Sequence, residues 1–291
     1  MVCSMTGYGY GYGEKDGVGI AIEMKSVNHR YLDLSFRLPK ELQRWEEKIR
    51  GRVKDNIERG RVEIRLKLES VPEDMHTVQV NRSLVQAYHR ALQDVNGIIG
   101  ESNSVTCEHL LNFPEIFIVE DRLEDDEILS EAIEGGLMEA LNGLLAQRKK
   151  EGENLRRDLL ERCVTIEQNV EKADAKAPMV VENYRNRLQQ KLKELEGGLD
   201  TEERVQTECA MFAERCDITE EIVRMRSHLQ LFRETVQLEG AIGRKLDFIL
   251  QEMFREINTL GSKGNNKEIS GLVVEMKTDL EKMREQVQNI E

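Results

Sequence analysis

The sequence predicts an α+β fold that is predominantly helical overall, with a small N-terminal β-sheet carrying a packed helix, long central helical arms and an all-α C-terminal domain. Alternation of apolar and polar residues with a period of two is confined to the first 70 residues, and helical periodicity dominates from residue 128. Charged residues make up 33% of the chain and aromatic residues only 5%, a balance typical of long helices with much exposed surface. We therefore expect three parts, at residues 1–127, 128–200 and 201–291.

The first of four expected strands covers residues 7–13, where glycine and tyrosine alternate. Glycine at every second position indicates a strand whose backbone is closely approached by something else. The tyrosines then either pack on one face of an edge strand or are exposed for the stacking of bases. Alternation also predicts strands at residues 20–27, 32–38 and 62–68, and helical periodicity predicts a helix at 41–57.

The loop between the second and third strands contains Asn28, His29 and Arg30. A turn needs a small polar residue such as Asn28, but it does not need histidine and arginine beside it. Functional residues collect in loops held by two strands, so this loop is either a plain polar hairpin or a binding loop. The outward face of the strand at 62–68 is mainly basic and begins with Arg61; it either contacts phosphates or is simply solvated.

Two long charged helices are expected in the central part, at residues 128–172 and 179–196, with Pro178 as the break between them. Joined at that point, they would form a projecting helical hairpin. The basic cluster at 148–150 could contact nucleic acid, although its acidic neighbours favour a solvated face.

A predicted helix at residues 243–263 has two contrasting faces. The apolar face consists of Ile242, Leu246, Ile249, Leu250, Met253, Phe254, Ile257 and Leu260. The opposite face carries Arg244, Asp247, Gln251, Arg255 and Asn258, flanked by Lys245, Glu252 and Glu256. A continuous row of arginine, carboxylate, amide and lysine suits phosphate recognition or metal chemistry, and the alternative is a helix with ordinary i,i+4 ion pairs.

Two further helices are expected on either side of it. Asp217 and Glu220 have the form of a capping box, and they open a helix on which Arg224 and His228 lie one turn apart. His228 is either a structural hydrogen-bonding group or a ligand. The last helix has apolar residues in 4-3 spacing, typical of a coiled-coil seam that packs on another helix of the chain or of a neighbouring subunit. These residues are Ile269, Val273, Met276, Leu280, Met283, Val287 and Ile290.

Composition argues against several classes of protein. The net charge of −13 disfavours nonspecific binding of polyanions, although the first 70 residues carry 14 Lys and Arg against 11 Asp and Glu. Five scattered cysteines without a CxxC pair disfavour a disulfide framework or a structural zinc site. No apolar run approaches the ~20 residues that cross a bilayer, and the start lacks the features of a signal peptide. We expect a cytoplasmic protein without a membrane partner.

The common catalytic motifs are absent. The chain has no GxxxxGK[ST] loop, no GxGxxG between a strand and a helix, no HExxH and no GxSxG. Arginine, lysine, histidine, asparagine and carboxylates remain, and these groups suit phosphodiester chemistry. Arginine and lysine neutralise charge in the transition state, and carboxylates hold a divalent ion that activates water.

Several motifs resemble those of the YicC/YloC family. The N-terminal matches are SMTGYG at 4–9, EMKSVNHRYLD at 23–33, RLP at 37–39 and RGRVE at 59–63. The C-terminal matches are DITEE at 217–221 with Arg224 and His228, GRKLDF at 243–248, QE at 251–252, REINT at 255–259, SK at 262–263, EMK at 275–277 and REQVQNIE at 284–291. The N-terminal resemblance extends to about residue 155, and the Tyr-Gly steps after Gly9 lengthen the usual opening of the family.

This resemblance implies a bacterial cytoplasmic endoribonuclease that depends on a divalent metal ion (Mn²⁺ or Mg²⁺), acts in RNA turnover and assembles as a ring-like homohexamer around an RNA-binding channel. We assign catalytic roles to His228, Glu252, Glu256 and Arg255, with His228, Glu252 and Glu256 as metal ligands. The expected RNA contacts are Asn28, His29, Arg30, Arg61, Arg224, Arg244, Lys245, Asn258 and Lys263. The competing hypotheses are a non-catalytic hexameric scaffold that presents RNA to another nuclease, and a purely structural oligomer.

Overall fold

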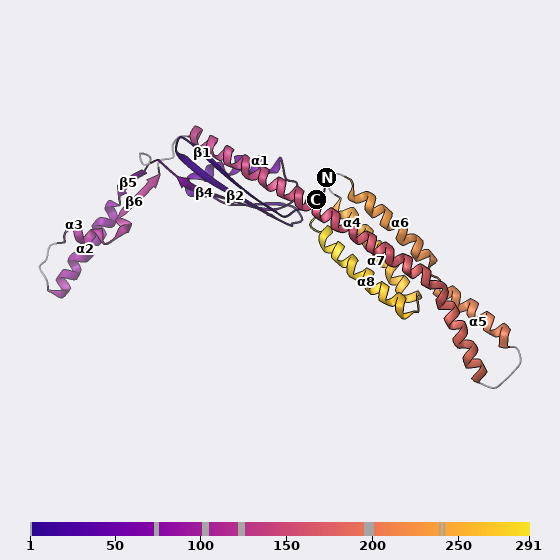
Figure 1. Ribbon diagram of the computed structural model, residues 1–291. Coiled ribbons are helices and arrows are strands. Elements are labelled where there is room, and N and C mark those ends of the chain that lie inside the picture. The colour runs from indigo at the N-terminus through magenta and orange to yellow at the C-terminus, as the bar shows by residue number, and fades with distance from the viewer. Residues whose placement is uncertain are drawn as a thin grey trace.

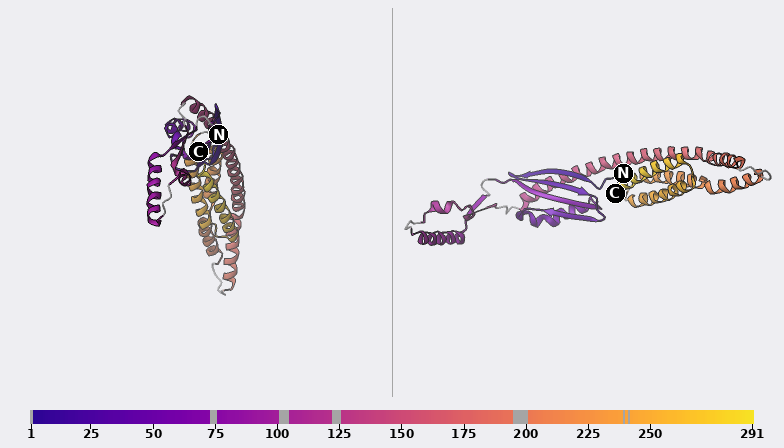
Figure 2. Two further views of the ribbon diagram at one scale, coloured as in Figure 1. Left: turned by 90° about the vertical axis from the view of Figure 1, so that its left-hand side faces the viewer. Right: turned by 90° about the horizontal axis from the view of Figure 1, so that it is seen from below.

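The computed structural model describes residues 2–72, 76–100, 105–121, 126–194, 201–238, 240 and 242–291. The molecule is elongated, with a small lobe at one end, a β-sheet in the middle and a bundle of helices that narrows to a hairpin at the other end (Figures 1 and 2). The two chain ends lie side by side where the sheet meets the bundle (Figure 2). This arrangement confirms the predominantly helical α+β fold.

The central sheet has four strands in the order β1-β2-β4-β3. They are β1 (Gly7–Lys15), β2 (Val18–Val27), β3 (Leu32–Arg37) and β4 (Gly60–Ser70). Strand β4 lies between β2 and β3 and pairs with β3 in parallel. Of the two alternatives for residues 26–31, the plain hairpin is therefore wrong, because β2 and β3 are not neighbours and the loop has to pass across the end of β4.

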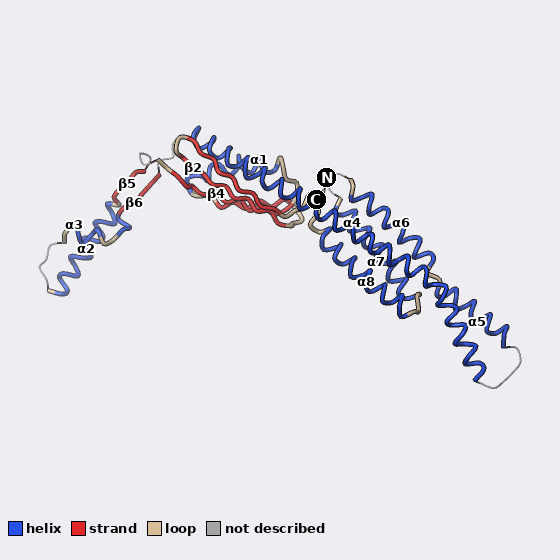
Figure 3. The backbone as a smooth tube through the Cα atoms, viewed as in Figure 1, coloured by secondary structure: helices blue, strands red, loops and turns tan. Residues whose placement is uncertain are grey.

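One face of the sheet is covered by helices (Figure 3). The short 3-10 helix η1 (Lys40–Trp45), helix α1 (Glu46–Lys54) and the first part of α4 (Asp126–Glu194) bury inward-pointing residues of β2 and β4. Ile20, Ile22 and Met24 of β2 and Val62 and Ile64 of β4 are fully or almost fully buried there. The alternation of apolar and polar residues therefore places the core between the sheet and these helices.

The glycines of β1 allow α4 to lie directly on the strand. A Cβ added at Gly9 would lie 1.9 Å from the Ala140 carbonyl oxygen, and one at Gly11 would lie 2.1 Å from the Gly136 carbonyl oxygen. Helix α4 also covers the free edge of β1, since side chains of Gln147 and Glu139 accept hydrogen bonds from backbone N–H groups of that strand. The element that approaches the glycine strand is thus a helix, and its polar side chains satisfy an otherwise open sheet edge.

The lobe at the far end of the sheet contains β5 (His76–Val80), α2 (Arg82–Ile99), α3 (Cys107–Leu111), η3 (Pro114–Ile116) and β6 (Phe117–Asp121). Strands β5 and β6 pair with each other. Asn81 caps α2 by accepting a hydrogen bond from the Leu84 N–H at 3.1 Å. The two short strands that carry the lobe were not predicted from the sequence.

Helix α4 continues without interruption from the sheet into the bundle and passes through Pro178. The prediction of a helix break at this proline is wrong. The projecting hairpin is formed instead by the end of α4 and by α5 (Thr201–Cys216), where the rings of Tyr184 and Phe212 stack with their centroids 3.8 Å apart.

The bundle consists of α4 with α6 (Thr219–Val236), α7 (Gly243–Lys263) and α8 (Lys267–Val287). The predicted seam of the last helix is confirmed, because all of its residues from Ile269 to Ile290 are buried, here against helices of the same chain. The predicted capping box is wrong. Asp217 accepts a hydrogen bond from the Thr219 N–H at 2.9 Å, but Glu220 pairs with Arg224 rather than reaching back.

The chain ends hold the sheet and the bundle together. The N–H of Met5 donates to the Asn289 carbonyl at 2.8 Å, and Ser4 and Ile290 form an antiparallel bridge. The side chain of Arg148, which is only 3% exposed, pairs with Glu291 and donates to the Ser4 carbonyl at 2.7 Å. The suggestion that the basic cluster at 148–150 contacts nucleic acid therefore fails for Arg148.

Two smaller predictions concern the thiols and the membrane. None of the five cysteines forms a disulfide; Cys163 is buried, which raises the pKa of its thiol to about 12, and Cys107 is exposed. Among the described residues, no helix is long and apolar enough to cross a membrane.

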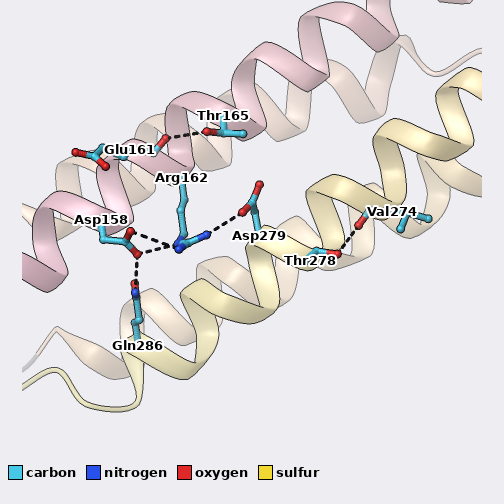
Figure 4. Close-up of polar contacts among 8 residues, drawn as sticks. All are labelled: Asp158, Glu161, Arg162, Thr165, Val274, Thr278, Asp279 and Gln286. Carbon is cyan, nitrogen blue, oxygen red and sulfur yellow. Dashed lines mark hydrogen bonds and ion pairs between the residues drawn. The ribbon is translucent and has the colours of Figure 1, made fainter.

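Acidic pH is expected to destabilise the contact between α4 and α8. Burial opposes the ionisation of Asp158, but hydrogen bonds from Gln286 and Arg162 outweigh it and lower the pKa of the carboxyl (Figure 4). Arg162 also donates to Asp279 at 2.9 Å. A carboxyl whose folded-state pKa is lowered stabilises the fold above its unfolded pKa of ~4, and this contribution is lost as the pH falls through the folded value.

We therefore expect the free energy of unfolding, measured by urea titration, to decline below about pH 4, and Asp158→Asn to flatten this dependence. The control is Glu161→Gln, an exposed residue of the same helix with no ion pair to a described residue. An equal pH dependence in wild type and Asp158→Asn would contradict the prediction.

Candidate functional site

The polar row of α7 faces solvent. Arg244, Lys245, Gln251, Arg255 and Asn258 are all exposed. Most contacts along the row lie within α7, since the Gln251 amide donates to Asp247 at 2.8 Å and the Arg255 guanidinium donates to Glu252 at 2.5 Å. Asp247 also lies 3.8 Å from Arg284 of α8. Ion pairs of the ordinary helical kind therefore exist, but Arg244, Lys245 and Asn258 have no side-chain partner within the described part of the chain and are available to a ligand.

A buried polar contact joins α6 to α7. The Glu221 side chain is only 6% exposed and pairs with the Lys263 ammonium at 2.8 Å. This hydrogen bond raises the pKa of Lys263 and keeps it cationic. The second carboxylate oxygen of Glu221 has no hydrogen-bond partner among the described residues. A buried carboxylate oxygen without a hydrogen-bond partner is energetically costly. A hydrogen-bond donor that reaches this oxygen would therefore stabilise the α6–α7 contact.

One helical turn along α6, Arg224 lies between two carboxylates. Its guanidinium is 3.6 Å from Glu256, whose side chain is 10% exposed, and it also pairs with Glu220. His228 follows one turn later and is half-buried. It makes no hydrogen bond or ion pair with any residue that the structure describes. The predicted residues Arg224, Glu256 and Lys263 thus come together across two antiparallel helices.

Glu221 was not among the predicted site residues, although a signal was present. It lies three residues after Ile218 and four before Met225, both buried, so it occupies an inward position of α6. Glu256 stands in the same relation to Met253 and Leu260 on α7. A carboxylate at an inward helical position is rare unless it is paired, and this rule would have identified both residues.

The predicted metal ligands can be compared with the positions of the carboxylates on α7. Within the described ranges, no group of three or more His, Cys, Asp and Glu side chains is placed to hold a metal ion. Glu252 and Glu256 lie one turn apart on α7, but each is close to an arginine. Mg²⁺ is often held by only one or two carboxylates together with substrate phosphates and water. The residues therefore fit an ion shared with a phosphate ligand, and they do not form a closed metal cage.

The predicted N-terminal contacts lie at the other end of α7. The Asn28 amide donates to the Gln288 carbonyl at 2.8 Å, so this side chain holds the loop against the end of α8. His29 is hydrogen-bonded to the Tyr31 carbonyl at 2.9 Å, and the Arg30 guanidinium lies 5.2 Å from the centre of the Tyr31 ring. Arg30 and Tyr31 are exposed, and a ligand can reach them.

Arg244 lies near this loop, because a Cβ at the preceding Gly243 would be 2.8 Å from the Ile290 carbonyl oxygen beside the chain end that Asn28 binds. Twelve residues of helix, about 18 Å, separate Arg244 from Glu256. Arg61 borders the junction group, because it pairs in register with Val27, the residue before Asn28, and its guanidinium lies 3.6 Å from Asp33. The structure therefore divides the predicted residues into a junction group, with Arg61 beside it at the end of the sheet, and a group between α6 and α7.

The structure thus defines an α+β protein with exposed cations along α7 and beside the junction, and with carboxylates buried between two helices. Comparison with known proteins narrows this class. The family "Endoribonuclease YicC-like, N-terminal region" matches residues 2–157, and "Endoribonuclease YicC-like, C-terminal" matches residues 173–291.

Two relatives are similar over their full length. A protein of Clostridioides difficile (strain 630) named "Probable endoribonuclease YicC" is 35% identical over 293 residues, covering 100% of both chains. A protein of Haemophilus influenzae with the same name is 33% identical over 291 residues, again with 100% of both chains covered. The chain belongs to the YicC-like endoribonuclease family.

Proposed function

We propose that this protein is an endoribonuclease that hydrolyses phosphodiester bonds in RNA with the help of Mn²⁺ or Mg²⁺, and that it acts in RNA turnover in the cytoplasm as a homohexamer. The observation that carries the proposal is the buried contact between α6 and α7, where Glu221 and Glu256 are held beside Lys263 and Arg224. The names of the full-length relatives support the activity.

In this reaction the cations of the contact bind the RNA backbone. Arg224, Arg255 and Lys263 would hold the phosphate and offset the charge that develops on its oxygens. Their pairing with carboxylates in the free protein keeps the side chains ordered before RNA arrives. The exposed Arg244 and Lys245, with His29 and Arg30 at the junction, would hold a more distant part of the same RNA.

The carboxylates supply the second part of the chemistry. Glu252 or Glu256 would orient the attacking water and accept its proton, and His228, which has no partner in the described chain, is free to exchange a proton with the leaving oxygen. When a divalent ion is bound, Glu252, Glu256 and His228 would instead hold it together with the phosphate, and the ion would offset the negative charge of the phosphate and lower the pKa of bound water.

The test is cleavage of an end-labelled RNA of about 25 nucleotides with manganese, with and without a chelator. We expect the Glu252→Gln/Glu256→Gln variant to cut at least about 100-fold more slowly, the loss typical of removing a general base. The matched control is Glu281→Gln/Glu285→Gln, which removes two exposed carboxylates with the same spacing from α8. Cleavage that persists with chelator, or that is undiminished in the α7 variant, would refute these assignments.

The second candidate is a hexameric scaffold that binds RNA and presents it to another nuclease. The ion pairs of Glu256 with Arg224 and of Glu221 with Lys263 favour it, because they engage both buried carboxylates in contacts within the protein. RNA binding without turnover, in protein free of contaminating nuclease, would identify the scaffold. Absence of RNA binding even at low salt, where phosphate contacts are strongest, would instead indicate a purely structural oligomer. Light scattering would measure the number of subunits.

A further inference from the structure

The outward face of the central sheet is uncovered. Helices α1 and α4 both lie on the opposite face, so alternate residues of the four strands point away from these helices. The residues of this open sheet face are Tyr8, Tyr10, Tyr12 and Glu14 of β1, Ala21, Glu23 and Lys25 of β2, Arg61, Glu63, Arg65, Lys67 and Glu69 of β4, and Asp33, Ser35 and Arg37 of β3. Three tyrosines of a chain that has six in all are thus gathered along one strand.

These three rings lie outside the hydrophobic core between the sheet and the helices. The glycines that alternate with them contact α4, whereas the tyrosines are 47%, 47% and 37% exposed at positions 8, 10 and 12. A Cβ at Gly19 would lie 2.2 Å from the Tyr12 hydroxyl oxygen. Tyr12 therefore reaches across the neighbouring strand β2 rather than standing upright, which leaves one side of its ring toward solvent. A row of such rings is a platform for flat aromatic groups.

Cations accompany the rings. Alternate residues of a strand are about 7 Å apart, which sets the spacing of the rings along β1. Beside the ring of Tyr8 is a shallow cleft of about 190 Å³, which is lined by Tyr8, Glu23, Lys25, Glu63 and Arg65. Lys25 and Arg65 form no ion pair with a described residue. The other three cations of the face are occupied, since Arg37 lies 2.7 Å from Glu63, Arg61 lies 3.6 Å from Asp33 and Lys67 lies 3.9 Å from Glu69.

We infer that the open sheet face binds single-stranded RNA, with its bases stacked on Tyr8, Tyr10 and Tyr12 and its phosphates contacted by Lys25 and Arg65. Helices on one face of a four-stranded sheet and exposed aromatic residues on the other suit this task, because unpaired bases can be splayed out and stacked. A duplex keeps its bases stacked internally and cannot use the rings. The inference rests on the proposed function and specifies the form of RNA that the protein takes.

The balance of charges on the open sheet face indicates which interaction contributes most to RNA binding. Only two cations are free, and Glu23, which also has no ion pair with a described residue, lies beside them. Stacking rather than counterion release must therefore supply most of the affinity of this face for RNA. For single strands each phosphate contact contributes about −0.7 to the slope of log K against log salt. We expect removal of Lys25 and Arg65 to make this slope shallower by no more than about 1.4.

The experiment measures binding of a fluorescein-labelled, unstructured 12-nucleotide RNA and of the matching duplex by fluorescence anisotropy, with a chelator present to prevent cleavage. We expect Tyr8→Ala/Tyr10→Ala/Tyr12→Ala to weaken binding of the single strand at least about tenfold, the loss that follows when a well-stacked base is released. Tyr8→Phe/Tyr10→Phe/Tyr12→Phe keeps the rings and should bind within about threefold of wild type. Duplex binding should change little in either variant.

Each outcome is decisive. If the triple alanine variant binds the single strand within twofold of wild type, the inference is overturned. A variant that changes its number of subunits but keeps its RNA affinity would also overturn it, because the face would then be a contact between copies of the chain. If the triple alanine variant loses its cooperative melting transition, the three single alanine variants take its place, and at least one must weaken binding. A wild-type protein that neither binds nor cuts RNA would refute the proposed function itself, whereas cleavage with an unaffected alanine variant would refute only the platform.

Discussion

Alanine in place of the β1 glycines is expected to separate α4 from the sheet. In Gly9→Ala the new Cβ would lie 1.9 Å from the Ala140 carbonyl oxygen and 2.8 Å from the Leu144 nitrogen, both backbone atoms of α4. Because neither atom can rotate away, the helix must shift, and overpacking of this kind costs about 1–3 kcal/mol. Adding Gly11→Ala and Gly13→Ala extends the clash along the strand, and the total loss then approaches the whole stability of a typical domain, about 5–15 kcal/mol.

Urea denaturation followed by circular dichroism measures this loss. Glycine in a strand is itself slightly unfavourable, so destabilisation by alanine reports the contact with α4 rather than strand propensity. The matched control is Gly51→Ala on α1, where no atom lies within 4 Å of the added Cβ and helix propensity should stabilise the protein by about 0.5–1 kcal/mol. Equal effects at positions 9 and 51 would show that α4 does not pack on β1 in this way.

Loss of the Arg148 side chain is expected to weaken the junction between the sheet and the bundle. Arg148 is 3% exposed and holds both the Glu291 carboxylate and the Ser4 carbonyl. In Arg148→Met the Glu291 carboxylate keeps its buried position but loses its countercharge, and breaking a buried pair from one side typically costs about 3–5 kcal/mol.

The adjacent Lys149 provides the control, because it is exposed and Lys149→Met removes the same charge. We expect that variant to change the free energy of unfolding by less than about 0.5 kcal/mol. The double variant Arg148→Met/Glu291→Gln should recover part of the loss, since it no longer buries an unpaired charge. A purely additive double variant would mean that the two side chains do not interact.

Much of the fold could be predicted because the local periodicity of apolar residues indicates which segments are strands and which are helices. The strands at 20–27, 32–38 and 62–68 and the helix at 243–263 follow from periods of 2 and 3.6, which decide which side chains can share a buried face. The plain hairpin at 26–31 could not be ruled out in the same way, because the order of strands depends on pairing between distant segments. Pro178 was misleading for a related reason, since tertiary packing of α4 on α6 and α8 keeps a helix intact at a residue that disfavours it locally.

The candidate site was predictable in composition and less so in arrangement. The sequence showed that the polar face of the helix at 243–263 differs in residue types from an ordinary solvated helix face. It also showed Arg224 and His228 one turn apart on the preceding helix. Asn28 was expected to bind RNA, but its amide is committed to the Gln288 carbonyl, a partner 260 residues away that no local pattern indicates. Glu221 was overlooked because its importance comes from burial beside Lys263.

The sequence by itself determined most of the helical and strand segments and the resemblance to one family. Only the tertiary structure decided that the glycine side of β1 contacts α4 while its tyrosine side is open, and that Arg148 is buried at the junction. The physical reason is that periodicity records which residues face the same way, whereas the partner on the facing surface is selected by packing and charge among segments far apart in the chain.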